Sequence, residues 1–144
     1  MVERLALYEW GLRIAEATAL RGTCVRRRVG AVALSAEGHV LATGYNGVPR
    51  DWPHCDVTPC GGGGFASGEA LDLCEAIHAE QNLVAQCADV MRVHTICVTT
   101  APCVSCVKLL LTTSAQNLVF RYYYNEHALM LWHRSGREWF HHGS

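Results

Sequence analysis

The sequence has little lysine, little charge overall and no long apolar run. Of its 144 residues, 17% are charged, the formal net charge is −1, and Lys108 is the single lysine beside eleven arginines. A net charge so close to zero gives no overall field that would attract a nucleic-acid backbone. The apolar runs fall short of the roughly 20 residues that a transmembrane helix needs. We therefore expect neither a nucleic-acid polymer nor a membrane among the partners.

The N-terminus also lacks the pattern of a secretory signal peptide, because charged Glu3 and Arg4 follow Met1 closely. We therefore expect a cytosolic protein, either in a bacterium or in an infected host cell. Thiols stay reduced in the cytosol, where clusters of cysteine bind metal more often than they form disulfides. The eight cysteines of the chain are accordingly candidate metal ligands.

Half of the residues are apolar, and 144 residues are enough to bury one hydrophobic core, so we expect a single domain over residues 1–144. Hydrophobic periodicity predicts helices over 2–21, 71–87, 103–114 and 126–134, and strands over 29–34, 40–45, 93–99, 118–122 and 137–140. This order predicts an α/β fold with helices on both sides of a mixed sheet. Residues 50–68 lack periodicity and are expected to form a long loop.

Two segments carry the residue types of a catalytic zinc site: His78-Ala79-Glu80 and Pro102-Cys103-Val104-Ser105-Cys106. The three ligands His78, Cys103 and Cys106 leave the fourth tetrahedral position open for water, as in catalytic rather than structural zinc sites. A bare Cys-x-x-Cys also occurs in redox motifs and zinc ribbons. His-x-Glu followed by Pro-Cys-x-x-Cys is, by contrast, the signature of zinc-dependent nucleobase deaminases.

The two cysteines lie three residues apart near the predicted start of a helix, so they share one face of its first turn. A helix N-terminus favours the thiolate, which is the form that binds metal. We expect Glu80 to be the catalytic residue, which takes a proton from the zinc-activated water and passes protons to the ring nitrogen and the leaving ammonia. The alternative is a structural zinc with Glu80 as the fourth ligand, although two positions along a helix turn a side chain by about 200°.

Four stretches of the chain resemble the deoxycytidylate (dCMP) deaminases of bacteria and phages, a family within the cytidine deaminase superfamily. They are Cys24-Val-Arg-Arg-Arg-Val-Gly-Ala31, Gly44-Tyr-Asn-Gly-Val-Pro49, Cys74-Glu-Ala-Ile-His-Ala-Glu-Gln-Asn82 and Thr99-x-x-Pro-Cys-x-x-Cys106, and the similarity covers about residues 5–125. The resemblance implies a three-layer α-β-α fold with a five-stranded mixed sheet, usually in a homohexamer. It also implies hydrolysis of dCMP to dUMP, which feeds dTMP synthesis. Members of the family are often activated by dCTP and inhibited by dTTP.

The resemblance implies roles for individual positions as well. Asn46 would hydrogen-bond the deoxyribose, the backbone around Ala79 would meet the base carbonyl, and Tyr124 would line the nucleotide. The substrate phosphate would be met before the first strand, where the sequence does not decide among three consecutive arginines: Arg26, Arg27 and Arg28. Two positions depart from the family pattern, since Asp51 replaces a common glycine and Ala115-Gln116 replaces a common Gly-Ile.

Four further cysteines lie at element ends or in the long loop: Cys24, Cys55, Cys60 and Cys74. Relatives in the family often carry a second, structural zinc, and these four thiols could form a closed four-cysteine site that fastens the loop to the sheet edge. His54 is the candidate substitute ligand. Cys87 and Cys97 fall in a predicted helix and an apolar strand, and we interpret them as core thiols.

Several functions remain open from the sequence. It does not separate dCMP from free cytidine or deoxycytidine, or from a 5-modified dCMP. A deaminase of tRNA adenosine would need a basic surface, which the net charge disfavours. A non-enzymatic alternative is a silent nucleotide sensor that binds dCTP or dTTP, but a sensor has no use for a proton carrier such as Glu80.

Overall fold

Five strands form one mixed sheet in the part of the chain that the computed structural model describes, residues 3–24, 27–54 and 76–143. The strands are β1 (Gly30–Ser35), β2 (Val40–Tyr45), β3 (Val93–Thr100), β4 (Asn117–Tyr122) and β5 (Glu138–His141). The helices are α1 (Leu7–Ala19), α2 (Ala79–Gln86), α3 (Val104–Leu110) and α4 (Glu126–Arg134), with a 3₁₀ helix, η2 (Val90–Arg92). Each predicted strand is confirmed to within about two residues.

The order of strands across the sheet is β2-β1-β3-β4-β5. β1 runs antiparallel to both β2 and β3, whereas β3, β4 and β5 run parallel to one another. The carboxyl ends of β3 and β4 therefore lie at the same edge of the sheet. Consequently, the loop that leads from β3 to Cys103 begins beside the three tyrosines of residues 122–124.

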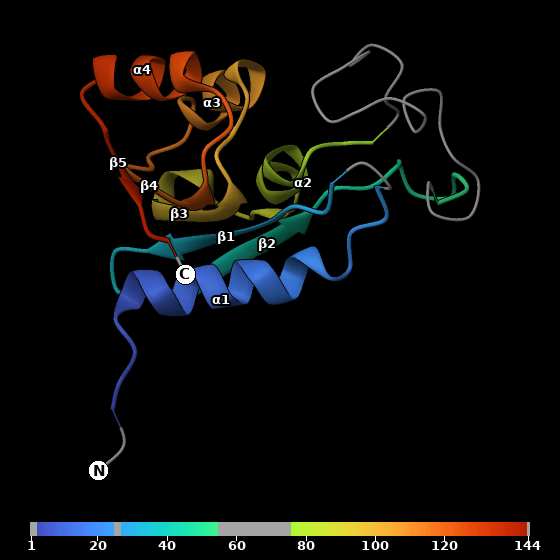
Figure 1. Cartoon of the computed structure of the whole chain (residues 1–144), viewed down its shortest axis with the longest axis horizontal. Coiled ribbons are helices and arrows are strands. Elements are labelled where there is room, and N and C mark those ends of the chain that lie inside the picture. The colour runs from blue at the N-terminus through green and yellow to red at the C-terminus, as the bar shows by residue number, and fades with distance from the viewer. Residues whose placement is uncertain (1–2, 25–26, 55–75, 144) are drawn as a thin grey trace.

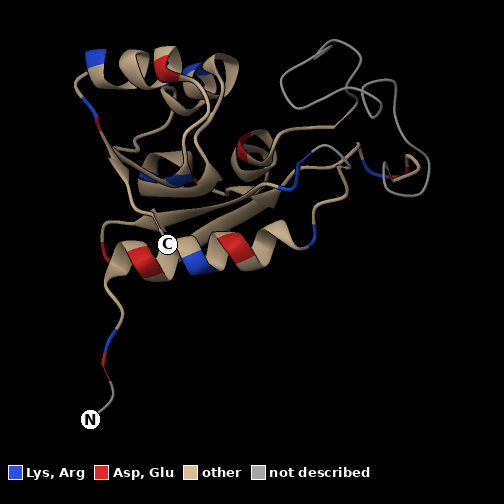
Figure 2. Cartoon of the chain, in the orientation of Figure 1, with Lys and Arg blue, Asp and Glu red and all other residues tan. Residues whose placement is uncertain are grey.

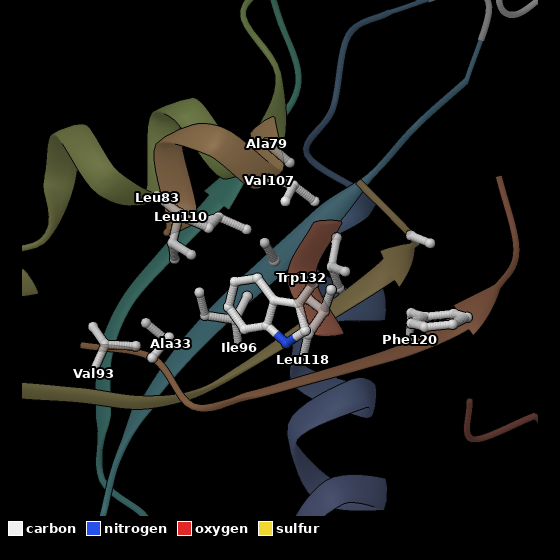
Figure 3. Close-up of a cluster of buried hydrophobic side chains, with 14 of the residues drawn as sticks. Ala33, Ala79, Leu83, Val93, Ile96, Val107, Leu110, Leu118, Phe120 and Trp132 are labelled. Carbon is white, nitrogen blue, oxygen red and sulfur yellow. The ribbon is translucent and has the colours of Figure 1, made fainter. Parts of the chain in front are cut away.

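Helices cover both faces of the sheet, as the predicted three-layer arrangement requires (Figure 1). α1 packs on one face through an apolar cluster that joins Leu12 and Ala15 to Val32 and Val119. α2, α3 and α4 cover the other face through a larger cluster (Figure 3), in which the Trp132 ring lies among strand residues. The indole Nε1 of Trp132 also donates a hydrogen bond to the carbonyl of Glu138 at 2.7 Å.

Two glycines let helices approach the β1–β2 hairpin closely. A Cβ on Gly30 would overlap the carbonyl oxygen of Ala15 in α1, and a Cβ on Gly44 would overlap the carbonyl oxygen of Ala79 in α2. Neither position can therefore take a larger residue unless the helix moves away from the sheet. Gly44 thus sets how close the first turn of α2, which follows His78, comes to the sheet.

Three predicted helices are shorter in the structure than the periodicity predicts. α1 begins at Leu7 rather than at residue 2. Residues 76–78 are not helical, because Ile77 forms a β-bridge with Gly47, so α2 begins at Ala79. α3 ends at Leu110, where the hydroxyls of Thr112 and Thr113 donate to backbone carbonyls of the last turn.

Arg137 closes the C-terminal end of α3. Its guanidinium donates to the carbonyls of Leu111 and Ala115 at 2.9 and 2.8 Å, and it lies over the ring of Trp132. A cation at this end of a helix satisfies carbonyl groups that have no partner within the helix. The departure from the family pattern at Ala115 thus falls at a capped helix end.

Charged residues are spread over the described part of the chain, and acidic and basic residues alternate along α1 (Figure 2). In residues 3–24, 27–54 and 76–143, no helix is both long enough and apolar enough to cross a bilayer. The extent of the single domain, residues 1–144, remains a prediction.

Candidate active site

The beginnings of two helices bring the three predicted zinc ligands together. His78 precedes the first residue of α2, Cys103 precedes the first residue of α3, and Cys106 lies in the first turn of α3. Among the described residues, these three form a group whose potential ligand atoms all lie within 4.8 Å of one another.

The distances within this group fit a tetrahedral metal ion. The Nδ1 atom of His78 lies 3.2 Å from Sγ of Cys106 and 3.6 Å from Sγ of Cys103. Zinc bonds of ordinary length to nitrogen and sulfur, at a tetrahedral angle, separate the two atoms by about 3.5 Å. One imidazole and two thiols are also a donor set that zinc prefers. These residues therefore fit a zinc ion with a fourth position left for another ligand.

Hydrogen bonds within the group favour a thiolate. Interaction with the Cys106 thiol, followed by contacts with His78 and Ser105, lowers the pKa of Cys103 to about 3. The same hydrogen bond with Cys103, together with burial, raises the pKa of Cys106. Cys103 also raises the pKa of His78. A thiolate at Cys103 is ready to bind a metal ion, and binding of the ion would displace protons from the other ligands.

His78 is held by its neighbours on both sides along the chain. Its backbone N–H donates to Oε1 of Gln81 at 2.8 Å, which is half of a capping box at the start of α2. The preceding residue, Ile77, exchanges two backbone hydrogen bonds with Gly47. Asn82 donates from Nδ2 to the carbonyl of Tyr45 at 2.8 Å. The sequence motifs indicate no role for Gln81, although a glutamine three residues after a helix cap is the signal that could have identified it.

Glu80 lies beside this group but does not belong to it. Its side chain is buried, with 4% of the residue exposed, and burial raises the pKa of its carboxyl to about 7. The carboxyl is near enough to Cys106 for a hydrogen bond, yet Glu80 is outside the group whose ligand atoms meet within 4.8 Å. A carboxyl with a pKa near neutrality can both accept and donate a proton at working pH.

The residues predicted to meet the nucleotide surround the two helix starts. Ala79 is the buried first residue of α2, and Asn46 follows β2 with 9% of its surface exposed. Tyr124 is exposed, and the guanidinium of Arg27 lies 5.5 Å from the centroid of its ring. Arg28 is exposed, and Arg26 lies outside the described residues.

Comparison with known proteins identifies the family. The family model of the cytidine and deoxycytidylate deaminase zinc-binding region matches residues 6–122. The chain belongs to this family. A deoxycytidylate deaminase of Mycobacterium phage D29 is 34% identical over 118 residues, which cover 78% of this chain and 91% of the phage protein.

Other deaminases of the family are longer. The deoxycytidylate deaminase of Schizosaccharomyces pombe is 34% identical over 119 residues, which cover 79% of this chain but 36% of the yeast protein, so the chain spans about a third of that relative. Among solved structures, the dCMP deaminase of cyanophage S-TIM5 in complex with dCMP and dUMP aligns with a TM-score of 0.76 at 21% identity. That alignment covers 96% of this chain and 98% of the phage chain, and it supports the deaminase fold.

Three of the four cysteines predicted to bind a second, structural zinc, Cys55, Cys60 and Cys74, lie outside the described residues. The remaining predicted ligand, Cys24, is a buried free thiol, and the site stays a prediction. Cys97 is a core thiol, as interpreted from the sequence, and burial raises its pKa to about 12.

Asp51 occupies the position where relatives in the family often have glycine. Its φ is 73°, in the left-handed region that glycine adopts without strain. The substitution therefore keeps a glycine-like backbone in the loop after β2, with a residue type that tolerates this region better than most.

Proposed function

We propose that the chain is a zinc-dependent dCMP deaminase that hydrolyses dCMP to dUMP and releases ammonia. The observation that carries the proposal is the meeting of His78, Cys103 and Cys106 beside a buried carboxyl, Glu80. The 34% identity with a phage protein named deoxycytidylate deaminase supports the same substrate.

Each residue of the site has one task in this proposal. His78, Cys103 and Cys106 would hold a zinc ion, which would supply a Lewis acid that lowers the pKa of a water molecule toward neutrality. Glu80 accepts the proton of the attacking water and delivers it to the ring nitrogen next to the carbon that is attacked. Glu80 then takes the remaining proton from the hydroxyl group that was added to the carbon and gives it to the amino group, so the C–N bond breaks, ammonia leaves and the carbon becomes a carbonyl.

Recognition of the nucleotide is assigned to the residues around the helix starts. The backbone at Ala79 meets the base carbonyl, and the second side-chain N–H of Asn46 is the group proposed to meet a deoxyribose hydroxyl. Arg27 is the proposed phosphate contact, because its guanidinium lies over the ring of Tyr124 and the residue is exposed to a ligand. A planar guanidinium suits a phosphate oxygen pair.

Activation by dCTP, inhibition by dTTP and a homohexamer are proposals that rest on the resemblance. The cytosolic location is likewise a proposal, which rests on the sequence. Turnover of dCMP measured with and without each triphosphate tests the regulation, and light scattering tests the assembly. Acceleration by dCTP and a six-subunit mass are the expected results.

Ammonia release from purified protein tests the function itself. We expect dUMP and ammonia from dCMP, with a much lower kcat/KM for deoxycytidine, which lacks the phosphate. If deoxycytidine or 5-hydroxymethyl-dCMP were turned over faster than dCMP, that compound and not dCMP would be identified as the substrate. Absence of ammonia from every cytosine nucleotide and nucleoside, in zinc-loaded protein, would contradict deaminase activity.

A further inference from the structure

Asn46 directs both ends of its side-chain amide at the protein's own backbone. Its Oδ1 accepts a hydrogen bond from the backbone N–H of Val29 at 2.8 Å, and its Nδ2 donates to the carbonyl of Arg27 at 2.5 Å. Main-chain bonds join the same segments, since Asn46 N–H donates to the Val29 carbonyl and Thr23 N–H donates to the Asn46 carbonyl. Asn46 is nine-tenths buried, so its end of each side-chain bond lies in the interior of the protein.

These bonds limit what Asn46 can offer a substrate. A side-chain amide has two N–H donors and one carbonyl oxygen with two lone pairs. One donor and one lone pair are already used, and the two backbone bonds fix the plane of the amide. A sugar hydroxyl could still meet the second N–H, but half of the side-chain hydrogen-bonding capacity of Asn46 is directed at residues 27–29.

The segment that Asn46 holds carries the proposed phosphate contact. Residues 27–29 belong to no helix or strand, so no regular ladder of hydrogen bonds fixes the backbone of Arg27. Asn46 binds this backbone on both sides of Arg28, while the ring of Tyr124 lies under the Arg27 guanidinium. Asn46 thus restrains the backbone of Arg27, and Tyr124 restrains its guanidinium. A restrained arginine loses less conformational entropy when it binds an anion.

We infer that Asn46 is a positioning residue for the phosphate of the substrate, because it fixes the backbone from which Arg27 reaches over Tyr124. This inference rests on the proposed function. It differs from a direct sugar contact in one measurable respect. A sugar contact is lost equally for dCMP and for deoxycytidine, whereas a misplaced Arg27 affects only the substrate that has a phosphate.

A double-mutant cycle with two substrates tests the inference. The kcat/KM values for dCMP and deoxycytidine are compared in wild type, Asn46→Ala, Arg27→Gln and the double variant. We expect Asn46→Ala to lower kcat/KM about tenfold more for dCMP than for deoxycytidine, mainly through KM. In the Arg27→Gln background this extra loss should disappear, because the contact that Asn46 serves is already absent.

Two further variants keep the test interpretable. Asn46→Asp has the same shape and can still accept from Val29, but it cannot donate to the Arg27 carbonyl, so we expect the same selective loss. If circular dichroism and zinc content show that Asn46→Ala does not fold, the Asn46→Asp variant replaces it in the double-mutant cycle. Arg134→Gln, an exposed arginine at the end of α4, is the control for charge alone, and its ratio of the two substrates should stay within about twofold of wild type.

The outcomes separate the inference from the proposed function. Equal losses for both substrates in the Asn46 variants, or a selective loss that persists in the Arg27→Gln background, would overturn the positioning role while leaving the deaminase activity intact. A zinc-loaded wild type that deaminates neither substrate would overturn both.

Discussion

Each face of the sheet carries one glutamate whose pKa is shifted, and the two shifts have opposite directions: Glu9 is partly exposed, whereas Glu80 is buried. On the α1 face, hydrogen bonds from Arg121, and then from Arg13, lower the pKa of Glu9 to about 2. On the face covered by α2, α3 and α4, burial raises the pKa of Glu80 to about 7. The residue type is the same, so the difference arises from what surrounds each carboxyl.

The difference separates an acid that stabilises the fold from an acid that is suited to chemistry. Glu9 accepts two hydrogen bonds from the guanidinium of Arg121, at 2.9 and 2.7 Å, and this guanidinium also contacts Glu16. A carboxylate paired in this way stays ionised and has no proton to exchange near neutral pH. Glu80 gains no comparable cation from α2, and its proton can leave and return at pH 7.

The largest expected effect comes from removing the exchangeable proton. Glu80→Gln preserves the shape of the side chain but cannot carry protons, so we expect kcat for dCMP to fall by about 10³-fold or more. Zinc content, measured by plasma emission spectrometry, should remain as in wild type, because Glu80 is not among the proposed ligands. Activity within tenfold of wild type, or loss of the metal with the substitution, would place Glu80 in a different role.

The second-largest effect is expected on zinc affinity, from the hydrogen bond that orients His78. Gln81→Ala removes the hydrogen bond that holds the backbone of His78, and we expect zinc affinity to drop about tenfold. Competition with a chromogenic chelator measures this affinity without any need for turnover. Gln86→Ala, at the exposed end of the same helix, is the matched control and should leave affinity unchanged. Equal affinities in the two variants would show that the capping box does not orient His78.

A smaller effect, on thermal stability, is expected from the ion pairs of Glu9 on the α1 face of the sheet. Arg121 is 3% exposed, and Arg121→Gln leaves Glu9 without its main partner, so we expect the melting temperature to fall by about 5 °C. The activity of the folded fraction should change less than twofold. Arg13→Gln removes a 62% exposed partner of the same glutamate and should lower the melting temperature by about 1 °C at most. Similar changes in melting temperature for the two variants would mean that the burial of Arg121 does not strengthen its ion pair with Glu9.

The smallest effect is the pH dependence of the same pair. Because the pKa of Glu9 is lowered from 4.5 to about 2, its contribution to stability is fully present above pH 4.5 and is lost as the pH falls through 2. Urea denaturation of wild type and Glu9→Gln should therefore give a stability difference that shrinks across this range. A difference that stays constant between these pH values would contradict the ion pair.

Much of the site could be predicted from the sequence because its residues are close together along the chain. His78 and Glu80 are two residues apart and Cys103 and Cys106 are three apart, so one signature contains them all. The strands were also predictable, since β1 and β3 are short segments rich in apolar and β-branched residues that are nearly all buried, and the centre of β4 is buried as well.

Contacts between residues that are far apart in the sequence could not be predicted from sequence patterns. Arg121 and Glu9 are separated by 112 positions, and nothing around either residue indicates the other. The start of α2 was predicted too early because the bridge between Ile77 and Gly47, a tertiary contact, holds the preceding residues extended. The hydrogen bonds of Asn46 to residues 27–29 likewise depend on how β2 ends beside β1.

Removal and return of the metal test the central claim most directly. Protein stripped of zinc by a chelator and dialysed should release no ammonia from dCMP, and stepwise addition of zinc should restore activity in wild type but not in Cys106→Ser. Full activity in metal-free protein, or restoration of Cys106→Ser to the wild-type rate by the same zinc, would contradict a catalytic zinc at His78, Cys103 and Cys106.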